Sequence, residues 1–513
     1  MIAQRQFLMM LVFFAACSSC GKSVYSRRSL GEDEVPTVEE QPDPTPSVNA
    51  SPTSAAIITD FLRSDLANKQ TVRKDHGQVI LSNSMGDIAI AGVTRSKIIS
   101  PTPLEPSLAG DLFFTRYSPK KGWDETPIQV PVEAPTPTDP SATPLPLPDA
   151  LLIVKGGRLL DSGKALIVGE TTKTQFSQAQ LNLDETKSAT VNIFLTVFGA
   201  GESGMMRSVR MGLSGENIVA GAADGFGSNS LVVAGTTTSG LRRNQAQDVI
   251  TETATHSNYV MELDAGGNII RNLMWPTTDA TISRITSNKS FVFIASNSAD
   301  GKHVYVNGLR WHGKRDIVAL PMREVCATAS SSDRTIRASS LSVSETEVVV
   351  AVEIIDPSVA QGNVLPCFEV FQIRGNGLVV NKREQIFMPE FPSLKGTVHA
   401  QLVENDNVLL LRSRENSDSR GRTTAISTFL FSRPLLKEKY QSKFWSPSRP
   451  EDWYGTEDVN GVTRSIQGVV RSSHESHHGT IWVIANDRTN INGEWESLVN
   501  IGTYSTISKE AKP

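Results

Sequence analysis

Residues 230–237 read Ser-Leu-Val-Val-Ala-Gly-Thr-Thr, an apolar and β-branched run that ends in glycine and two threonines. Val and Thr favour extended backbone, and a run of this length between polar turn residues is typical of a β-strand. Its apolar residues are consecutive and not alternating, so both faces of the strand should be buried. The stretch therefore indicates a strand in a sheet that is covered on both sides.

The same pattern recurs along the chain, which identifies a repeat. With Leu231 as the anchor, equivalent runs have anchors at Ile88, Ala165, Phe291, Val348, Val408 and Ile481. Successive anchors are 57 to 77 residues apart. Most runs are followed by further short strands with Gly and Asn turn signals, as in the hairpin predicted at 264–268. Four short strands in each unit make one blade of a β-propeller.

The sequence therefore predicts an all-β fold, a β-propeller of seven four-stranded blades within residues 55–513. A two-sheet array and an eight-bladed ring remain as alternatives. Residues 131–148 contain seven prolines and predict an exposed polyproline loop inside the propeller. Residues 54–70 are compatible with either a helix or a strand that closes the ring.

Residues 230–275 resemble the bacterial β-propeller repeat known as SBBP. They contain Val233-Ala-Gly-Thr-Thr237, then Leu263-Asp-Ala-Gly-Gly-Asn268, then the closing Trp275. The first two units follow this pattern less closely, and the last three keep the strands without the Ala-Gly-Thr signature. The resemblance implies a propeller with a binding or cell-surface role, and it transfers no catalytic residue.

Residues 1–16 have the layout of a signal peptide, with Arg5 followed by an apolar run over 7–14. This run is about half of the ~20 residues that a membrane-spanning helix needs. The segment Phe14-Ala-Ala-Cys17 resembles the bacterial lipobox, in which the cysteine becomes the lipidated N-terminus after cleavage. Cys20 is a second candidate, and an ordinary secreted protein is the alternative. By the same resemblance, Ser18 favours sorting to the outer membrane.

Residues 17–54 are predicted to form a lipidated N-terminus followed by a disordered tether. Its part from 32 to 54 has six acidic residues, five prolines and no Lys or Arg. Such a segment buries too little apolar surface to offset its ordering entropy. The membrane, reached through the lipid, is therefore the first predicted partner.

Charge and cysteine usage exclude several classes of protein. The chain has 513 residues with 50 Lys and Arg against 54 Asp and Glu, a formal net charge of -4. Nucleic acid is excluded as the main partner, because binding it requires a basic face. Four cysteines exclude a disulfide-built miniature scaffold. In an oxidising compartment Cys326 and Cys367 could bond between adjacent blades, and separate buried thiols are the alternative.

Two motifs match catalytic signatures without their structural context. Residues 474–478, His-Glu-Ser-His-His, fit H-E-x-x-H, which binds zinc only when both histidines lie on one helix. They are expected in a turn between strands, so His474 and His478 remain weak candidates for a surface metal. Residues 199–204 fit G-x-G-x-x-G but precede a predicted strand and not a helix. No catalytic residue and no cofactor are therefore predicted.

We therefore expect an outer-membrane lipoprotein whose propeller is a binding or scaffolding module for a protein or glycan, without catalysis. The alternative is a propeller enzyme, a hydrolase or lyase acting on envelope polymers with residues gathered in the channel. A third hypothesis is a part of an outer-membrane assembly machine. Partner-binding loops are expected at the longest insertions, 97–110, 131–148, 236–257 and 412–424. Within the last of these, residues 412–422 form a basic stretch that could meet an acidic partner.

Overall fold

The computed structural model describes residues 75–505 with gaps, of which the longest are 95–109, 131–151, 173–190 and 432–462. The described residues form β-strands and turns and contain no α-helix. Among them, no helix is long and apolar enough to cross a membrane. The predicted signal peptide, the tether, residues 54–70 and the loop 131–148 lie outside the described residues.

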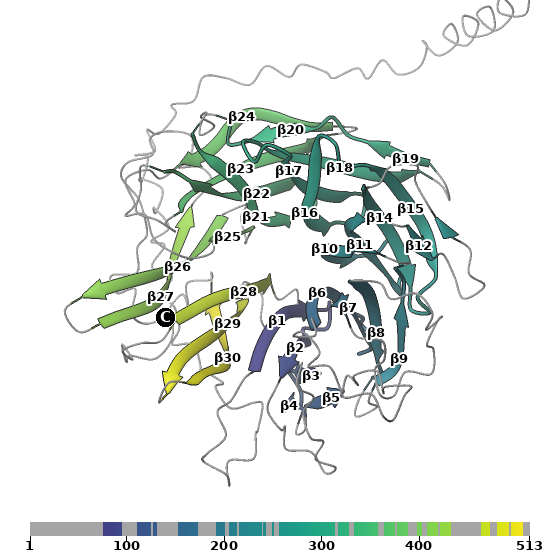
Figure 1. Cartoon of the computed structure of the whole chain (residues 1–513), viewed down its shortest axis with the longest axis vertical. Helices are drawn as coiled ribbons and strands as arrows, with labels where there is room; N and C mark the ends of the chain where they lie inside the picture. The colour runs from purple at the N-terminus through teal and green to yellow at the C-terminus, as the bar shows by residue number, and fades with distance from the viewer. Residues whose placement is uncertain are drawn as a thin grey trace, which may run out of the picture. The chain divides into compact units, whose positions relative to one another are not determined.

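Every sheet is antiparallel and formed by one continuous stretch of chain (Figure 1). The first sheet contains β1 (Asp75–Ser82), β2 (Ile88–Thr94), β3 (Asp111–Ser118), β4 (Gly122–Trp123) and β5 (Ile128–Val130). The second contains β6 (Leu152–Leu159), β7 (Ala165–Thr171), β8 (Asn192–Phe198) and β9 (Met205–Arg210). The third contains β10 (Asn217–Asp224), β11 (Ser230–Thr237), β14 (Ser257–Asp264) and β15 (Ile269–Pro276). Beside it, a two-stranded ribbon contains β12 (Leu241–Arg242) and β13 (Val249–Ile250).

The remaining sheets follow the same order along the chain. The fourth contains β16 (Ala280–Ser287), β17 (Val292–Ser298), β18 (Val304–His312), β19 (Asp316–Ala319) and β20 (Arg323–Val325). The fifth contains β21 (Thr335–Val343), β22 (Glu347–Ile355), β23 (Leu365–Arg374) and β24 (Gly377–Phe387). The sixth contains β25 (Val398–Leu402), β26 (Val408–Asp418) and β27 (Gly421–Phe431). The seventh contains β28 (Thr463–Arg471), β29 (Thr480–Ile491) and β30 (Glu494–Ser505).

The first strand of each sheet contacts the first strand of the next. These contacts run in sequence from β1 through β6, β10, β16, β21 and β25 to β28, and β28 contacts β1 again (Figure 1). Hydrophobic clusters fill the spaces between neighbouring sheets. The second strands lie between two such clusters, which explains why β2 and β7 are buried along their whole length. The repeated apolar runs therefore fold as predicted, each into or directly before the second strand of a sheet.

The first and seventh sheets, at the two ends of this series, contact each other through packed side chains. Ile80 and Ile88 of the first sheet share a cluster with Trp482 and Ile484 of the seventh. The Ser82 hydroxyl donates a hydrogen bond to the carbonyl oxygen of Arg471 (3.1 Å). Among the described residues, no strand from one end of the chain joins the sheet at the other end.

The prediction that residues 412–424 form a loop is wrong, because most of them lie in two paired strands. β26 continues to Asp418 and β27 begins at Gly421, and the two strands stay paired to the Asp418–Gly421 position. The stretch has no proline to end the ladder, and Thr423 and Thr424 favour extended backbone. The basic residues at 412–422 are therefore parts of a long hairpin and not of a loop.

The glycine of the Ala-Gly-Thr signature, which the first three sheets share, has a packing role. This glycine lies opposite an aromatic residue of the third strand, as Gly169 opposite Phe194 and Gly235 opposite Tyr259. At Gly235 the Tyr259 hydroxyl crosses the second strand and donates a hydrogen bond to the Ile218 carbonyl oxygen (2.9 Å). A Cβ at Gly235 would overlap that carbonyl oxygen and lie 2.7 Å from the hydroxyl. Glycine is required there because the first strand approaches too closely for any side chain.

We predict that Gly235→Ala lowers the free energy of unfolding by at least about 3 kcal/mol, because the overlapping atom is backbone and cannot move away. The matched control is Gly221→Ala in the adjacent strand, where a Cβ would lie 3.1 Å from an Ile285 methyl group. This control should cost about 1 kcal/mol or less. Chemical denaturation measures both values, and equal losses would contradict the close-approach explanation.

Candidate functional site

The first strands share a bulge at the same place in the sheet. In six of the described first strands the pairing with the second strand shifts by one residue. The extra residues are Gln78, Lys155, Ala220, Ser283, Ser339 and Gln467. A bulge leaves one residue without a ladder partner and re-aims the side chains around it. The repeated bulge therefore sets which side chains the first strands present to their neighbours.

A repeated hydrogen bond joins neighbouring sheets, and in four of its five instances the donor directly precedes the bulge. A backbone N–H of one first strand donates to a side-chain oxygen of the preceding sheet, at 2.6–3.1 Å. The donor and acceptor pairs are Val154 with Gln78, Val219 with Glu170, Ile282 with Asn258, Ala338 with Asn297, and Val398 with Glu353. First strands are sheet edges, so these donors have no partner in their own sheet. We call these five bonds the inter-sheet clasps.

Glu170 is one of the two charged acceptors and is almost fully buried. Its carboxylate accepts the Val219 N–H at 2.6 Å and lies 3.7 Å from the Lys155 ammonium. Burial raises the pKa of Glu170 above its ordinary value of 4.5, and the Lys155 charge and the Val219 N–H offset part of that effect. The clasp between the second and third sheets therefore contains a carboxylate that folding makes a weaker acid.

Glu353 makes the other charged clasp and holds three groups together. One carboxylate oxygen accepts bonds from the Ser339 hydroxyl (2.9 Å) and the Val398 N–H (3.1 Å). The other lies 2.6 Å from Nε of Arg337, whose side chain is 53% exposed. On the neighbouring strand β16, Arg284 donates from Nε to the Ser339 carbonyl oxygen (2.7 Å). The buried Glu353 carboxylate is therefore paired with the Arg337 guanidinium and is connected to the Arg284 guanidinium through Ser339.

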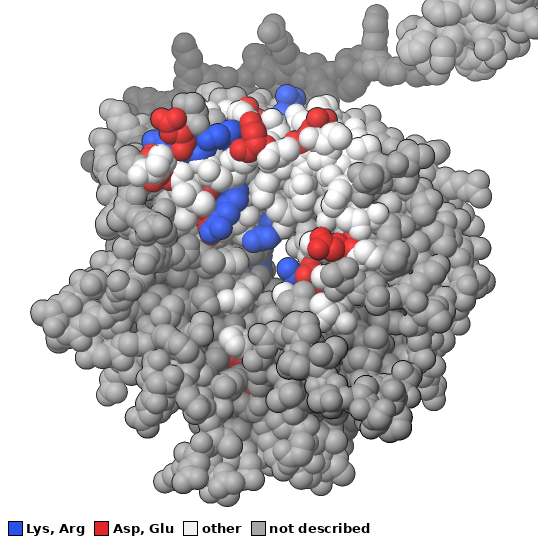
Figure 2. All heavy atoms as spheres, viewed as in Figure 1, with Lys and Arg blue, Asp and Glu red and all other residues white. Residues whose placement is uncertain are grey.

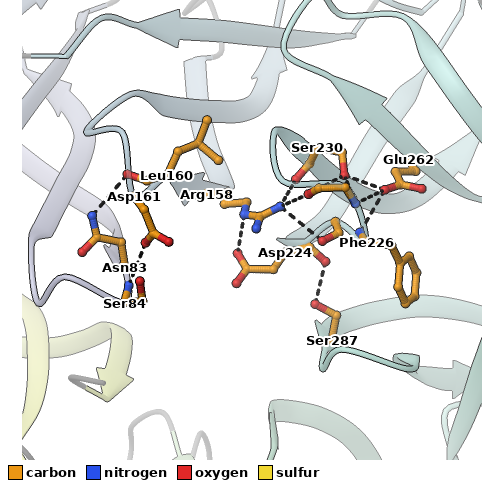
Figure 3. Close-up of polar contacts among 12 residues, drawn as sticks. Asn83, Ser84, Arg158, Leu160, Asp161, Asp224, Phe226, Ser230, Glu262 and Ser287 are labelled. Atoms are coloured by element: carbon orange, nitrogen blue, oxygen red, sulfur yellow. Dashed lines mark hydrogen bonds and ion pairs between the residues drawn. The ribbon is translucent and has the colours of Figure 1, made fainter. Parts of the chain in front are cut away.

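Turns between first and second strands interlock at one end of the sheets (Figure 3). Arg158, near the end of β6, donates to the carbonyl oxygens of Gly225, Gly227 and Ser230 in the next turn. Glu262 shapes that turn by accepting bonds from the N–H groups of Phe226 and Gly227 and from the Ser230 hydroxyl (Figure 3). The neighbouring turns are joined in the same way, with Asn83 donating to Leu160 and Ser84 to Asp161.

Asp224 is the exposed carboxylate of this region. It lies 3.4 Å from Nε of Arg158, and its side chain is 66% exposed (Figure 3). Partial desolvation by the surrounding protein raises the pKa of Asp224 above its ordinary value. The Arg158 charge lowers this pKa and the nearby Asp161 raises it. The turn end of the sheets therefore carries two neighbouring carboxylates, one of which is a weaker acid than usual and accessible to solvent.

Figure 2 shows Lys, Arg, Asp and Glu atoms along part of the rim of a central hollow in the face that it presents. The first strands supply charged residues of both signs, Lys155, Arg158, Asp224, Arg284 and Arg337. A scan for catalytic motifs missed these residues, because they are spread over four sheets. The signal that could have found them is a charged residue inside each strand-forming segment that precedes an apolar run.

The residues singled out in the sequence have different outcomes. Cys326 and Cys367 form a disulfide that joins the fourth and fifth sheets. Cys17, His474 and His478 lie outside the described residues. In the described part of the chain, no group of three or more His, Cys, Asp or Glu residues could hold a metal ion. The G-x-G-x-x-G stretch is followed by β9 and not by a helix.

No family model matches the sequence, and no curated protein matches it. Among solved structures, the chain is similar to the NanB sialidase from Streptococcus pneumoniae, with 9% identity and a TM-score of 0.39 over 87% of this chain and 71% of that one. It is similar to the acylaminoacyl peptidase from Pyrococcus horikoshii, with 9% identity and a TM-score of 0.39 over 87% of this chain and 54% of that one. It is also similar to the β-propeller domain of the trilobed protease from Pyrococcus furiosus, with 8% identity and a TM-score of 0.38 over 86% of this chain and all of that domain.

These similarities correct one prediction. The expectation that the chain is not an enzyme is withdrawn, because a sialidase and a peptidase are among the similar structures. Catalytic motifs are short stretches of sequence, whereas the charged residues of this fold come from several sheets, so the absence of such a motif does not exclude catalysis. Similarity at this level assigns no particular activity to the chain.

We predict that Glu170→Gln reduces the pH dependence of stability. Because folding raises the pKa of Glu170, the contribution of this group to stability is greatest below its ordinary pKa and is lost as the pH rises through the raised folded value. Glutamine keeps an oxygen that can accept the Val219 N–H, as Gln78 does for Val154, and it does not ionise. Urea unfolding between pH 4 and pH 8 should show a smaller decline for Glu170→Gln than for the native protein.

The control is Glu170→Ala, which removes both the charge and the acceptor. It should lose about 1–3 kcal/mol at every pH, because the buried Val219 N–H loses its partner. If Glu170→Gln kept the native pH profile, or lost as much stability as Glu170→Ala, the role given to this clasp would be wrong.

Proposed function

We propose that the chain is a cell-envelope lipoprotein with SBBP-like repeats, in which a seven-bladed β-propeller binds a ligand at the channel between its first strands. Cys17 would carry the lipid, and residues 17–54 would tether the propeller to the outer membrane. The repeat spacing, the closed series of first-strand contacts and the antiparallel sheets support this architecture. A protein or a glycan of the envelope would be the ligand.

One observation carries the binding function: charged side chains on the first strands remain accessible at the centre of the ring. Arg284 is exposed, Arg337 is 53% exposed and the Lys155 side chain is 31% exposed. Charges that only stabilise a fold are usually buried in pairs or spread over the outer surface. Accessible cations gathered from β6, β16 and β21 provide polar groups that a ligand in the channel can contact.

A second candidate function is a hydrolase or lyase acting on envelope polymers. The observation in its favour is the pair Asp161 and Asp224 at the turn end of the sheets. Asp224 is accessible and its pKa is raised, which suits a general acid, and Asp161 is close enough to affect that pKa. Propeller enzymes assemble such groups from different blades, and these two residues belong to the second and third sheets.

One experiment tests both functions. The purified Cys17→Ser chain is incubated with envelope polysaccharide, with peptidoglycan and with envelope proteins, and both retention and soluble fragments are measured over time. Retention without fragments is expected for a binding module. Fragment release that is lost in Asp224→Asn, but not in the exposed control Lys289→Gln, would establish the enzyme. The absence of both would overturn the proposal.

A separate prediction concerns location. The tagged native chain should fractionate with the outer membrane, and Cys17→Ser should be released into the soluble fraction because the lipid is its anchor. Protease treatment of intact and permeabilised cells then distinguishes the surface from the periplasmic face. Retention of the Cys17→Ser chain in the membrane would contradict the lipid tether, and Cys20→Ser serves as the control for the second candidate cysteine.

A further inference from the structure

Arg284 is an accessible cation without an ion pair of its own. Its guanidinium donates to two backbone carbonyl oxygens, from Nε to Ser339 and from Nη1 to Ser283, each at 2.7 Å. Among the described residues, no carboxylate lies within ion-pair distance of it. By contrast, Lys155, Arg158 and Arg337 of the first strands each lie against a carboxylate.

The carboxylate that most stabilises the charge of Arg284 is Glu353, and it already forms an ion pair with Arg337. Glu353 stabilises the charge of Arg284, but its carboxylate pairs directly with Arg337 and accepts two further hydrogen bonds. Arg337 in turn repels Arg284. Two guanidiniums and one carboxylate leave a formal excess of one positive charge on the adjoining strands β16 and β21.

This excess charge is unfavourable in the protein without a ligand. Protein around Arg284 and the neighbouring Arg337 both lower the pKa of Arg284, although Glu353 offsets part of that effect. A hydrogen bond to the Ser339 carbonyl needs only a neutral donor, so packing of the sheets does not require a cation here. A bound anion would balance the charge that the described residues leave unpaired.

We propose that Arg284 and Arg337 form a subsite for one monoanionic carboxylate group of the ligand in the channel. This inference rests on the proposed binding function and specifies the chemistry of its ligand as an acidic polysaccharide. Guanidinium groups bind carboxylates through paired N–H donors, and both side chains are exposed to solvent. The charge of the ligand group matches the single excess positive charge, which a phosphate monoester would exceed.

The test uses the full Cys17→Ser chain and calorimetric titration with oligogalacturonate, neutral dextran and inorganic phosphate. Oligogalacturonate should bind, and added salt should weaken the binding. Arg284→Gln should weaken it at least about tenfold. Arg284→Lys should have an intermediate effect, because lysine keeps the charge and loses the planar fork. The control Lys289→Gln, in an exposed ion pair with Glu345, should bind as the native chain does.

Thermal unfolding provides a second measurement. Oligogalacturonate should raise the Tm of the native chain and raise that of Arg284→Gln less. If Arg284→Gln itself failed to fold, Arg284→Lys would carry the test. Equal affinity of the native chain and a folded Arg284 variant, or preference for dextran or phosphate, would overturn the carboxylate subsite while leaving the binding function in place. Failure of every envelope polymer and protein to bind in the earlier assay would instead overturn the proposed function.

Discussion

The first strand of each sheet is an edge, and its inward N–H groups have to find acceptors outside the sheet. Five of these donors are satisfied by a side chain of the preceding sheet, in the inter-sheet clasps. The acceptors differ in type, because glutamine, glutamate and asparagine all provide an oxygen at the required position. The fold therefore requires one acceptor oxygen at this position, whatever residue provides it. The clasps hold neighbouring first strands together, and the charged residues lie on these strands.

The residue that faces the third strand explains why the later sheets lack the glycine of the signature. In the first three sheets an aromatic side chain of the third strand packs over the glycine of the second. In the fourth sheet Ser296 pairs with Tyr305, and in the fifth Val352 pairs with Cys367. Cys367 bonds to Cys326 of the neighbouring sheet, so a covalent link lies where the earlier sheets use aromatic packing. The signature therefore reflects one packing solution among several.

The second strands could be predicted from the sequence because their burial requires apolar residues at most positions, and such runs are visible without any partner. The clasps could not be predicted, because nothing in the sequence distinguishes their acceptors from other polar residues. Each acceptor is recognisable only from the backbone N–H of the neighbouring sheet that it binds. The long hairpin of β26 and β27 was missed because its charged residues resemble a loop. For the candidate site, the sequence indicated a channel lined from several blades, but it did not identify Arg158, Arg284 or Arg337. Their proximity depends on contacts between strands that are more than fifty residues apart.

Each sheet is built from one uninterrupted segment, and the first and seventh sheets meet by packing of apolar side chains such as Ile80 and Trp482 and by the Ser82 hydrogen bond, without a shared strand among the described residues. A repeat can therefore be duplicated, lost or exchanged in evolution without breaking the hydrogen-bond ladder of any other repeat. The new neighbour has only to offer one acceptor and one apolar face. Such a gene can diversify the charges around its centre one unit at a time, and the ring becomes a frame on which binding preferences change by recombination of whole units.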